Sequence, residues 1–295
     1  MFRFHSRLVS VAILAWVSAL GQSSTPDVRL DLAKRHLGLS GLTGGNIRRA
    51  VYFDKTWQDI RLECSCPAGG IEIQTDGSLI GGDRSELILL DPEGRRRATF
   101  PEPKYTNRIT WNHRADRLAS IVFERSTQQL VLEYWPFRSQ HFTIVQRFER
   151  PNGNEPVATI SWSPDGSAIT YSRSGQIFVY TLADRKAVPV AEGSNPAWSP
   201  NGDRIAYRDK DGHASVVNPR DHSSRVLIPD LSIRLGVRWS PDSEFALVTL
   251  LRLNAGFHEE TEFLIYRVRD GKTTRIDPLI GGTTEDLVFW VVKHE

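Results

Sequence analysis

The sequence repeats one short phrase three times, a Trp followed by Ser-Pro and a turn-forming pair: Trp162-Ser163-Pro164-Asp165-Gly166, Trp198-Ser199-Pro200-Asn201-Gly202 and Trp239-Ser240-Pro241-Asp242-Ser243. Pro has the φ that the second position of a type I turn requires, Asp or Asn is tolerated at the third, and Gly supplies the positive φ that closes a hairpin. An apolar alternation follows each copy. Each copy therefore predicts a turn between two strands, with the Trp packed between sheets.

The spacing of the copies is that of a repeat architecture. Trp162, Trp198 and Trp239 are 36 and 41 residues apart, close to the roughly 40–45 residues that four short strands occupy in a β-propeller blade. Two degenerate copies lie upstream, one around Trp111 and one at 71–77 with Ile in the Trp position. The sequence thus predicts five units, which are residues 71–105, 106–150, 156–192, 193–230 and 233–277.

The units resemble a known repeat. A third strand recurs at 87–91, 177–180 and 263–268, and a polar turn follows each one. Trp-Ser-Pro-Asp-Gly, then Ile-Ala-Tyr, then an Ile-Phe-Val-Tyr strand resembles the repeat of TolB-type, WD-repeat-like (PD-repeat) β-propellers over residues 71–277. The resemblance implies an all-β propeller. TolB itself carries a separate α/β domain before its propeller, and the residues before 47 are too few to form one, so we expect a TolB-like chain and not TolB proper.

Two segments outside the five units can close a ring. Residues 47–62 are rich in apolar and β-branched residues, and Leu287–Val292 is one strongly apolar strand. Joining residues 283–294 to 47–66 gives a composite blade that removes the exposed edges of a linear array. We therefore expect a six-bladed β-propeller over residues 47–295.

The amino terminus has the features of a secretory signal peptide over residues 1–21, because Arg3 and Arg7 precede a short apolar run that ends in small residues. The run is shorter than the roughly 20 residues of a membrane span, and an uncleaved anchor is the alternative. Residues 22–46 are predicted to form a helix at 27–37 and a linker with a glycine hinge at 41–45. We expect an exported, periplasmic or secreted monomer with no membrane span after cleavage.

Charge argues against a nucleic-acid partner. Without Arg3 and Arg7 the chain has 35 basic and 35 acidic residues, whereas nucleic-acid binding calls for a basic face. The one local run, Arg95–Arg97, lies in a predicted turn. We therefore predict no nucleic-acid partner.

The two cysteines, Cys64 and Cys66, are only two positions apart. A disulfide between them requires a local bend, which Pro67 and the glycines at 69–70 allow. Two free thiols are the second possibility. A metal site is the third, although two thiolates need further ligands and no His pair at metal spacing is present.

The sequence contains no Gly-x-Ser-x-Gly elbow, no phosphate-binding loop and no His-Glu-x-x-His pair, so we predict no catalytic residues, metal or cofactor. Long loops on a rigid ring are where binding usually occurs. The densest titratable cluster lies in an insertion at 251–262, which gives the candidate binding residues Arg252, His258, Glu259 and Glu260. This insertion is predicted to lie on the face opposite the Ser-Pro turns.

The repeated residues are interpreted as structural rather than catalytic. They are Trp111, Trp162, Pro164, Asp165, Gly166, Trp198, Pro200, Gly202, Trp239, Pro241 and Asp242.

Two functional hypotheses follow. The first is a non-catalytic exported propeller that binds a protein, a peptide or an envelope component. The alternative is a propeller enzyme, either a lyase that uses His and carboxylate side chains on one face or the remnant propeller of a prolyl-peptidase-like enzyme.

Overall fold

The structure, a computed structural model, describes residues 25–44, 47–53, 55–64, 71–74, 78–82, 86–101, 106–112, 114–136, 139, 141–149, 159–229, 233–253, 259–276 and 289–292. Within these ranges there is one helix, α2 (Thr25–Lys34), and the remaining regular structure is antiparallel β-strand. No described helix is both long and apolar enough to span a bilayer. The predicted signal peptide lies outside the described residues.

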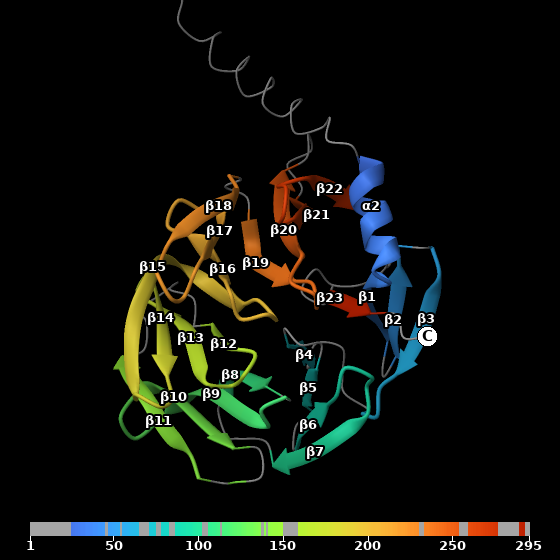
Figure 1. The fold of residues 1–295 in the computed structure, drawn as a ribbon. Helices are drawn as coiled ribbons and strands as arrows, with labels where there is room; N and C mark the ends of the chain where they lie inside the picture. Colours follow the sequence, from blue (N-terminus) through green and yellow to red (C-terminus); the bar gives the residue numbers. More distant parts are fainter. Residues whose placement is uncertain are drawn as a thin grey trace, which may run out of the picture.

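The strands form five hydrogen-bonded sheets arranged around a common centre (Figure 1). Four of them have four strands each. They are β4 (Ile71–Ile73), β5 (Leu79–Gly82), β6 (Glu86–Leu90) and β7 (Arg96–Pro101); β8 (Thr106–Asn112), β9 (Arg117–Glu124), β10 (Gln129–Pro136) and β11 (Thr143–Glu149); β19 (Ile233–Trp239), β20 (Phe245–Leu253), β21 (Glu259–Arg267) and β22 (Thr273–Ile276); and β23 (Phe289–Val292), β1 (Leu37–Gly44), β2 (Ile47–Tyr52) and β3 (Trp57–Arg61).

The fifth sheet has seven strands because one long strand takes part in two ladders. Its strands are β12 (Ile160–Trp162), β13 (Ala168–Arg173), β14 (Gln176–Thr181), β15 (Lys186–Trp198), β16 (Ile205–Asp209), β17 (Ala214–Val217) and β18 (Ser224–Ile228). The first half of β15 pairs with β14 and the second half with β16. Gly193 lies where the pairing changes: its φ is +154°, and a Cβ there would lie 2.3 Å from the carbonyl oxygen of Arg208.

The repeated Trp residues occupy equivalent places. Each is the Cα partner of the residue seven positions later, across the hairpin that its turn closes: Trp111 with Leu118, Trp162 with Ile169, Trp198 with Ile205, and Trp239 with Ala246. All four indoles are buried. Figure 1 shows β8, β12 and β19 toward the centre of the ring and β3, β7, β11 and β18 toward its periphery, while β15 begins at the outer edge.

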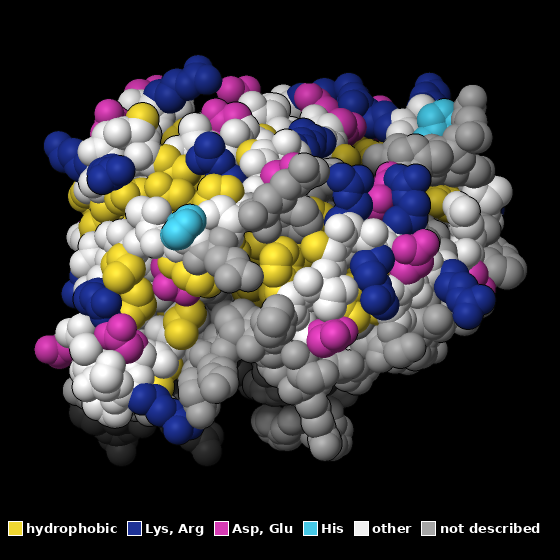
Figure 2. All heavy atoms as spheres, turned by 90° about the horizontal axis from the view of Figure 1, so that it is seen from below, with side chains coloured by type: hydrophobic (Ala, Val, Ile, Leu, Met, Phe, Trp, Pro, Cys, Tyr) yellow, Lys and Arg dark blue, Asp and Glu magenta, His cyan; other side chains and the backbone are white. Residues whose placement is uncertain are grey.

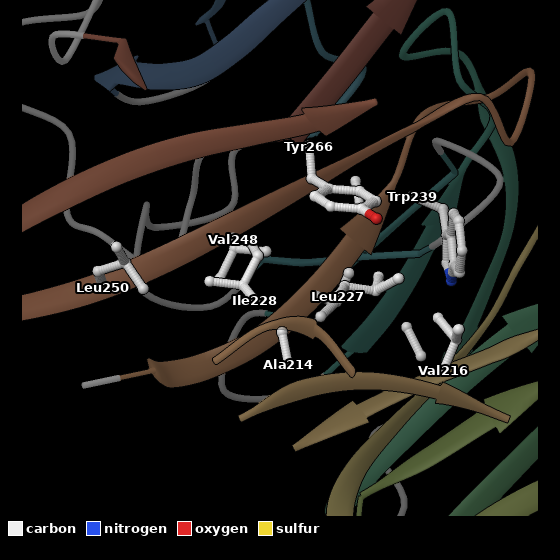
Figure 3. Close-up of a cluster of buried hydrophobic side chains, with 11 residues drawn as sticks. Ala214, Val216, Leu227, Ile228, Trp239, Val248, Leu250 and Tyr266 are labelled. Carbon is white, nitrogen blue, oxygen red and sulfur yellow. The ribbon is translucent and has the colours of Figure 1, made fainter. Parts of the chain in front are cut away.

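The core consists of apolar layers between neighbouring sheets. Figure 3 shows one such layer, in which Val216 and Leu227 of the seven-stranded sheet face Trp239, Val248 and the ring of Tyr266 from the next sheet. Each fully buried side chain of this size contributes about 1.5–3 kcal/mol to folding. Packing between sheets therefore holds the ring together and presents the ends of the inner strands at fixed positions.

The last described strand meets the beginning of the chain. β23 pairs with β1, and β2 and β3 follow outward. The sequence predicted that the last strand pairs within residues 47–62 and that residues 41–45 form a hinge. In the structure β23 pairs directly with β1, which continues through most of the predicted hinge to Gly44. Its alternation puts Leu37 and Leu39 in the core, which explains why so glycine-rich a segment is a strand.

Helix α2 covers the junction between the first and last sheets. It forms over 25–34, slightly earlier than predicted, and lies beside β22 and β1 (Figure 1). Val28 and Leu32 pack with Phe245, Ile265 and Trp290. Polar contacts add to this layer, because the buried guanidinium of Arg267 lies 3.3 Å from Asp31 of the helix and 2.6 Å from Asp270.

Candidate functional site

The three Ser-Pro turns share one hydrogen-bond pattern. The Ser hydroxyl donates to the Asp or Asn two residues later, at 2.6 Å for Ser163, 2.7 Å for Ser199 and 2.6 Å for Ser240. The same hydroxyl accepts the backbone N–H five residues later, at 2.9–3.0 Å. These Ser and Asp side chains are thus occupied within their own turns.

The electrostatics of Asp165 agree with this arrangement. Burial raises the pKa of its carboxyl, but hydrogen bonds from Ser163 and Ser167 outweigh burial and hold the pKa below its usual range. The group is an ionised acceptor that stabilises a turn. Such a carboxylate is poorly suited to act as a general base.

Neighbouring turns also contact one another. The Asn112 side chain donates to the carbonyl oxygens of Ser163, at 2.7 Å, and Pro164, at 3.2 Å, and the Asn201 N–H donates to the Ser243 hydroxyl at 3.0 Å. We call the surface formed by residues 112, 114–117, 163–168, 199–204 and 240–245 the Ser-Pro face. Contacts between its turns hold the inner strand ends in register with one another.

A small pocket opens on the Ser-Pro face between the inner strands β8, β12 and β15. Its volume is about 20 Å³, enough for roughly one water-sized group. The lining combines three repeated Trp residues with two prolines and four polar residues; it comprises Thr110, Trp111, Asn112, Arg114, Trp162, Pro164, Trp198, Ser199 and Pro200. Repetition of one phrase in neighbouring hairpins therefore builds a composite pocket.

Most polar side chains of the pocket are already paired. The Thr110 hydroxyl donates to Gln74 Oε1 at 2.5 Å, and Asn112 and Ser199 take part in the turn contacts described above. By contrast, the buried indole nitrogens of Trp162 and Trp198 have no acceptor within the described residues. Two residues of the lining thus contain buried donors whose hydrogen-bonding capacity is unused.

The candidate residues predicted on the opposite face are only partly within the described chain. Arg252 and Glu260 are Cα partners in the β20–β21 ladder, as are Leu253 and Glu259. The predicted insertion at 251–262 is therefore in large part a continuation of two strands, and His258 lies outside the described residues. Cys64 is buried as a free thiol, whereas Cys66, its proposed partner, also lies outside them.

A second titratable cluster lies at the turn between β16 and β17. Asp209, Asp211 and His213 present side-chain ligand atoms within 4.8 Å of one another. Burial raises the pKa of Asp209, but hydrogen bonds from the His213 N–H and the Ser215 hydroxyl bring it below its usual range. The Asp-x-Asp-x-His spacing was the available sequence signal, and these contacts explain it as a turn motif.

The surface visible in Figure 2 carries Lys and Arg interspersed with Asp and Glu around hydrophobic patches. Large exposed hydrophobic side chains in the described chain include Phe142 and Ile144, which flank the start of β11. The coloured side chains of that view show no field of a single sign. This surface is therefore unlike the basic face of a nucleic-acid-binding protein.

No family model and no curated protein matches the sequence. Among solved structures, TolB from Acinetobacter baumannii superimposes with a TM-score of 0.58 at 11% identity, over 86% of this chain and 66% of that one. A provisionally assigned TolB from Agrobacterium tumefaciens gives 0.57 at 12% identity, over 88% and 99%. Oligogalacturonate lyase from Vibrio parahaemolyticus gives 0.55 at 8% identity, over 81% and 78%.

These similarities confirm the predicted TolB-like β-propeller fold. At such low sequence identity the similarities establish the fold and not the function. The structural neighbours themselves include both TolB proteins and a lyase. Function must be argued from the site.

Proposed function

We propose that this chain is an exported, non-catalytic, six-bladed propeller that binds a protein or peptide through a pocketed face, and that it is monomeric. The count of six assigns β15 to two blades and makes the β23-β1-β2-β3 sheet the closing one. Export is supported by the character of residues 1–21, which gives a periplasmic or secreted location. The proposed domains keep residues 22–46 as an amino-terminal segment.

One observation carries the binding role: the lining of the pocket. Its aromatic and proline surface is suited to contact with an extended chain, and Arg114 at its edge makes no ion pair with another described residue. None of the nine lining residues is an acid, His, Lys or Cys. The lining therefore supplies shape, hydrogen-bond donors and one positive charge, which suit recognition better than proton transfer.

Site-specific photo-crosslinking in cells tests the proposal and assigns the face. The crosslinking amino acid is placed at position 114 on the Ser-Pro face, at position 258 in the insertion, and at position 97 as an exposed control on β7. We expect a discrete protein adduct from position 114 and none from position 97. An adduct from position 258 alone would move the binding surface to the insertion with Arg252, Glu259 and Glu260, and no adduct from either face would contradict the binding role.

A lyase remains the second candidate, because one structural neighbour is an oligogalacturonate lyase. The purified chain is incubated with oligogalacturonate and a divalent cation, and the unsaturated product is followed by its ultraviolet absorbance. Turnover that a chelator abolishes would favour the enzyme. We expect none, because catalysis needs convergent acid and base groups that the pocket does not present.

A further inference from the structure

A row of four residues crosses the seven-stranded sheet at the end remote from its Ser-Pro turns. Ser194 of β15 is the Cα partner of Arg208 on β16. Arg208 is in turn the partner of Ala214 on β17, which is the partner of Ile228 on β18. Cross-strand partners share one face of a sheet. Because Ala214 and Ile228 belong to the apolar layer drawn in Figure 3, Arg208 lies on the face that packs toward β20.

The charge of Arg208 is unpaired within the described chain. Its Nε is buried and has no hydrogen-bond partner, so the stem of the side chain is held in the layer. The residue is partly exposed, and its two terminal nitrogens remain accessible and without a partner. A cation beside an apolar layer is normally paired, because its desolvation costs free energy. Packing alone therefore does not explain why Arg stands at this position.

Two further polar groups without a described partner lie beside Arg208. They are the hydroxyl of Ser194 and the side-chain amide of Asn195, and both residues are partly exposed. The register shift between Ser194 and Ala197 places Asn195 in a β-bulge, and its φ of +55° is one that residues other than Gly rarely adopt. Bulges and strained residues are over-represented at functional sites, where they redirect side chains. This edge of the sheet thus gathers unused hydrogen-bond donors of three kinds.

The three donors suit a carboxylate. The planar fork of a guanidinium binds a carboxylate through two parallel N–H···O bonds, and a hydroxyl and an amide are neutral donors for its remaining lone pairs. One cation matches the single charge of a carboxylate, whereas a phosphate carries up to two. The nearest acid across the layer by register, Glu262, is paired with Arg275 at 2.9 Å. Arg208 is therefore left for a group from outside the chain.

We propose that Arg208, Ser194 and Asn195 bind a carboxylate of an acidic peptide segment. The carboxylate contacts the terminal nitrogens of Arg208, which are accessible, so no side chain has to leave its place. The site goes beyond the proposed function, because Arg208 lies at the end of β16 remote from the turn at 199–204 and thus away from the Ser-Pro face. The carboxylate comes either from an Asp or Glu side chain or from a peptide carboxyl terminus.

Nuclear magnetic resonance of the ¹⁵N-labelled full chain tests the proposal. The signals followed are the Nε–H of Arg208, assigned with Arg208→Lys, and the backbone N–H groups of Ser194 and Asn195. The probes are Ac-Gly-Asp-Gly-NH₂ for an acidic side chain, Ac-Gly-Gly-OH for a chain terminus and Ac-Gly-Asn-Gly-NH₂ as the neutral match, all at constant ionic strength. We expect these signals to shift saturably with at least one carboxylate probe and to stay in place with the Asn probe.

Two variants separate binding from stability. Arg208→Met keeps an unbranched stem in the layer and removes the charge, so it should weaken binding of the carboxylate probe by about tenfold or more. In urea unfolding this variant should be at least as stable as wild type, because the charge that it removes has no described partner. Arg97→Gln, at an exposed position on β7, should leave the affinity unchanged.

Four results would overturn the proposal. Equal shifts with the Asn probe, or no shift with any probe, would exclude a carboxylate site. Tighter binding of inorganic phosphate than of either carboxylate probe would assign the site to a different anion. An Arg208→Met chain that is markedly less stable than wild type would give Arg208 a structural role. An equal loss of affinity in Arg97→Gln would reduce the effect to the net charge of the chain.

Discussion

Arg267 offers the sharpest test of how helix α2 secures the ring. Its side chain is only 2% exposed, yet it carries a full charge between Asp31 of the helix and Asp270 of the following turn. A buried charge is tolerated only while it is paired, and removing one partner is costly. The prediction is therefore that Asp31, a residue of the only described helix, contributes strongly to the stability of a sheet more than 200 positions away.

The magnitude of the effect can be worked out for Asp31→Ala. Loss of the charge-assisted bond to Arg267 costs about 1.5–3 kcal/mol. Asp31 also pairs with Arg35 at 3.3 Å and Arg269 at 3.1 Å, and such half-exposed pairs add at most about 1 kcal/mol each. The better helix propensity of Ala returns about 0.5 kcal/mol. We expect a loss of about 2–4 kcal/mol.

Urea unfolding followed by Trp fluorescence measures this loss. The control is Asp211→Ala, which removes the 2.8 Å ion pair to Lys210. The side chains of Asp211 and Lys210 are 57% and 62% exposed, so this variant should be about as stable as wild type. When Arg267 is replaced by Met, the further substitution Asp31→Ala should lower the free energy of unfolding by at least about 1.5 kcal/mol less than it does in the wild-type chain, because the buried charge is gone. A stability of Asp31→Ala within about 0.5 kcal/mol of wild type would refute the reasoning.

Two further predictions concern ring closure and pH. Deleting residues 289–295 removes β23 and leaves β1 with an unpaired, apolar edge, so the product should aggregate or unfold; a soluble chain that unfolds cooperatively would speak against closure by this strand. Burial raises the pKa of Glu133, which lies opposite Ser120, so the ionised form of this side chain destabilises the fold. Glu133→Gln should therefore be more stable than wild type at pH 7. The difference in stability should vanish as the pH falls below about 4.3, the usual pKa of Glu. Thermal unfolding across pH measures this difference, and a pH-independent difference would exclude the titration of Glu133 as its cause.

The repeat could be predicted from sequence because its signals are local. Ser, Pro and Asp specify the turn through contacts within five residues, and the turn sets the pairing of each Trp with the residue seven positions later. The strand β1 could not be recognised in the same way. Its Gly and Ser residues are typical of a linker, and only contact with β23 and helix α2 makes it a strand.

The pocket depends on residues that are far apart in the sequence. Trp111, Trp162 and Trp198 belong to different hairpins, and nothing in a single copy of the phrase shows that two of the indoles lack an acceptor. The strand character of much of 251–262 was also not evident from the sequence. Charged residues such as Arg252 and Glu260 are typical of loops, but a ladder between two strands accommodates them as well.

The pairing of β1 with β23 has a consequence for the order of events as the protein is made. Residues 37–40 pair with residues 289–292. The ladder between β1 and β23 can therefore form only after almost the entire chain has been synthesised. Contacts of such long sequence separation form slowly, and until then Leu37 and Leu39 have no finished layer to enter. The newly made chain therefore passes through a stage in which the β1 edge is unpaired, and its first described strand is then exposed to proteases and to other copies of the chain.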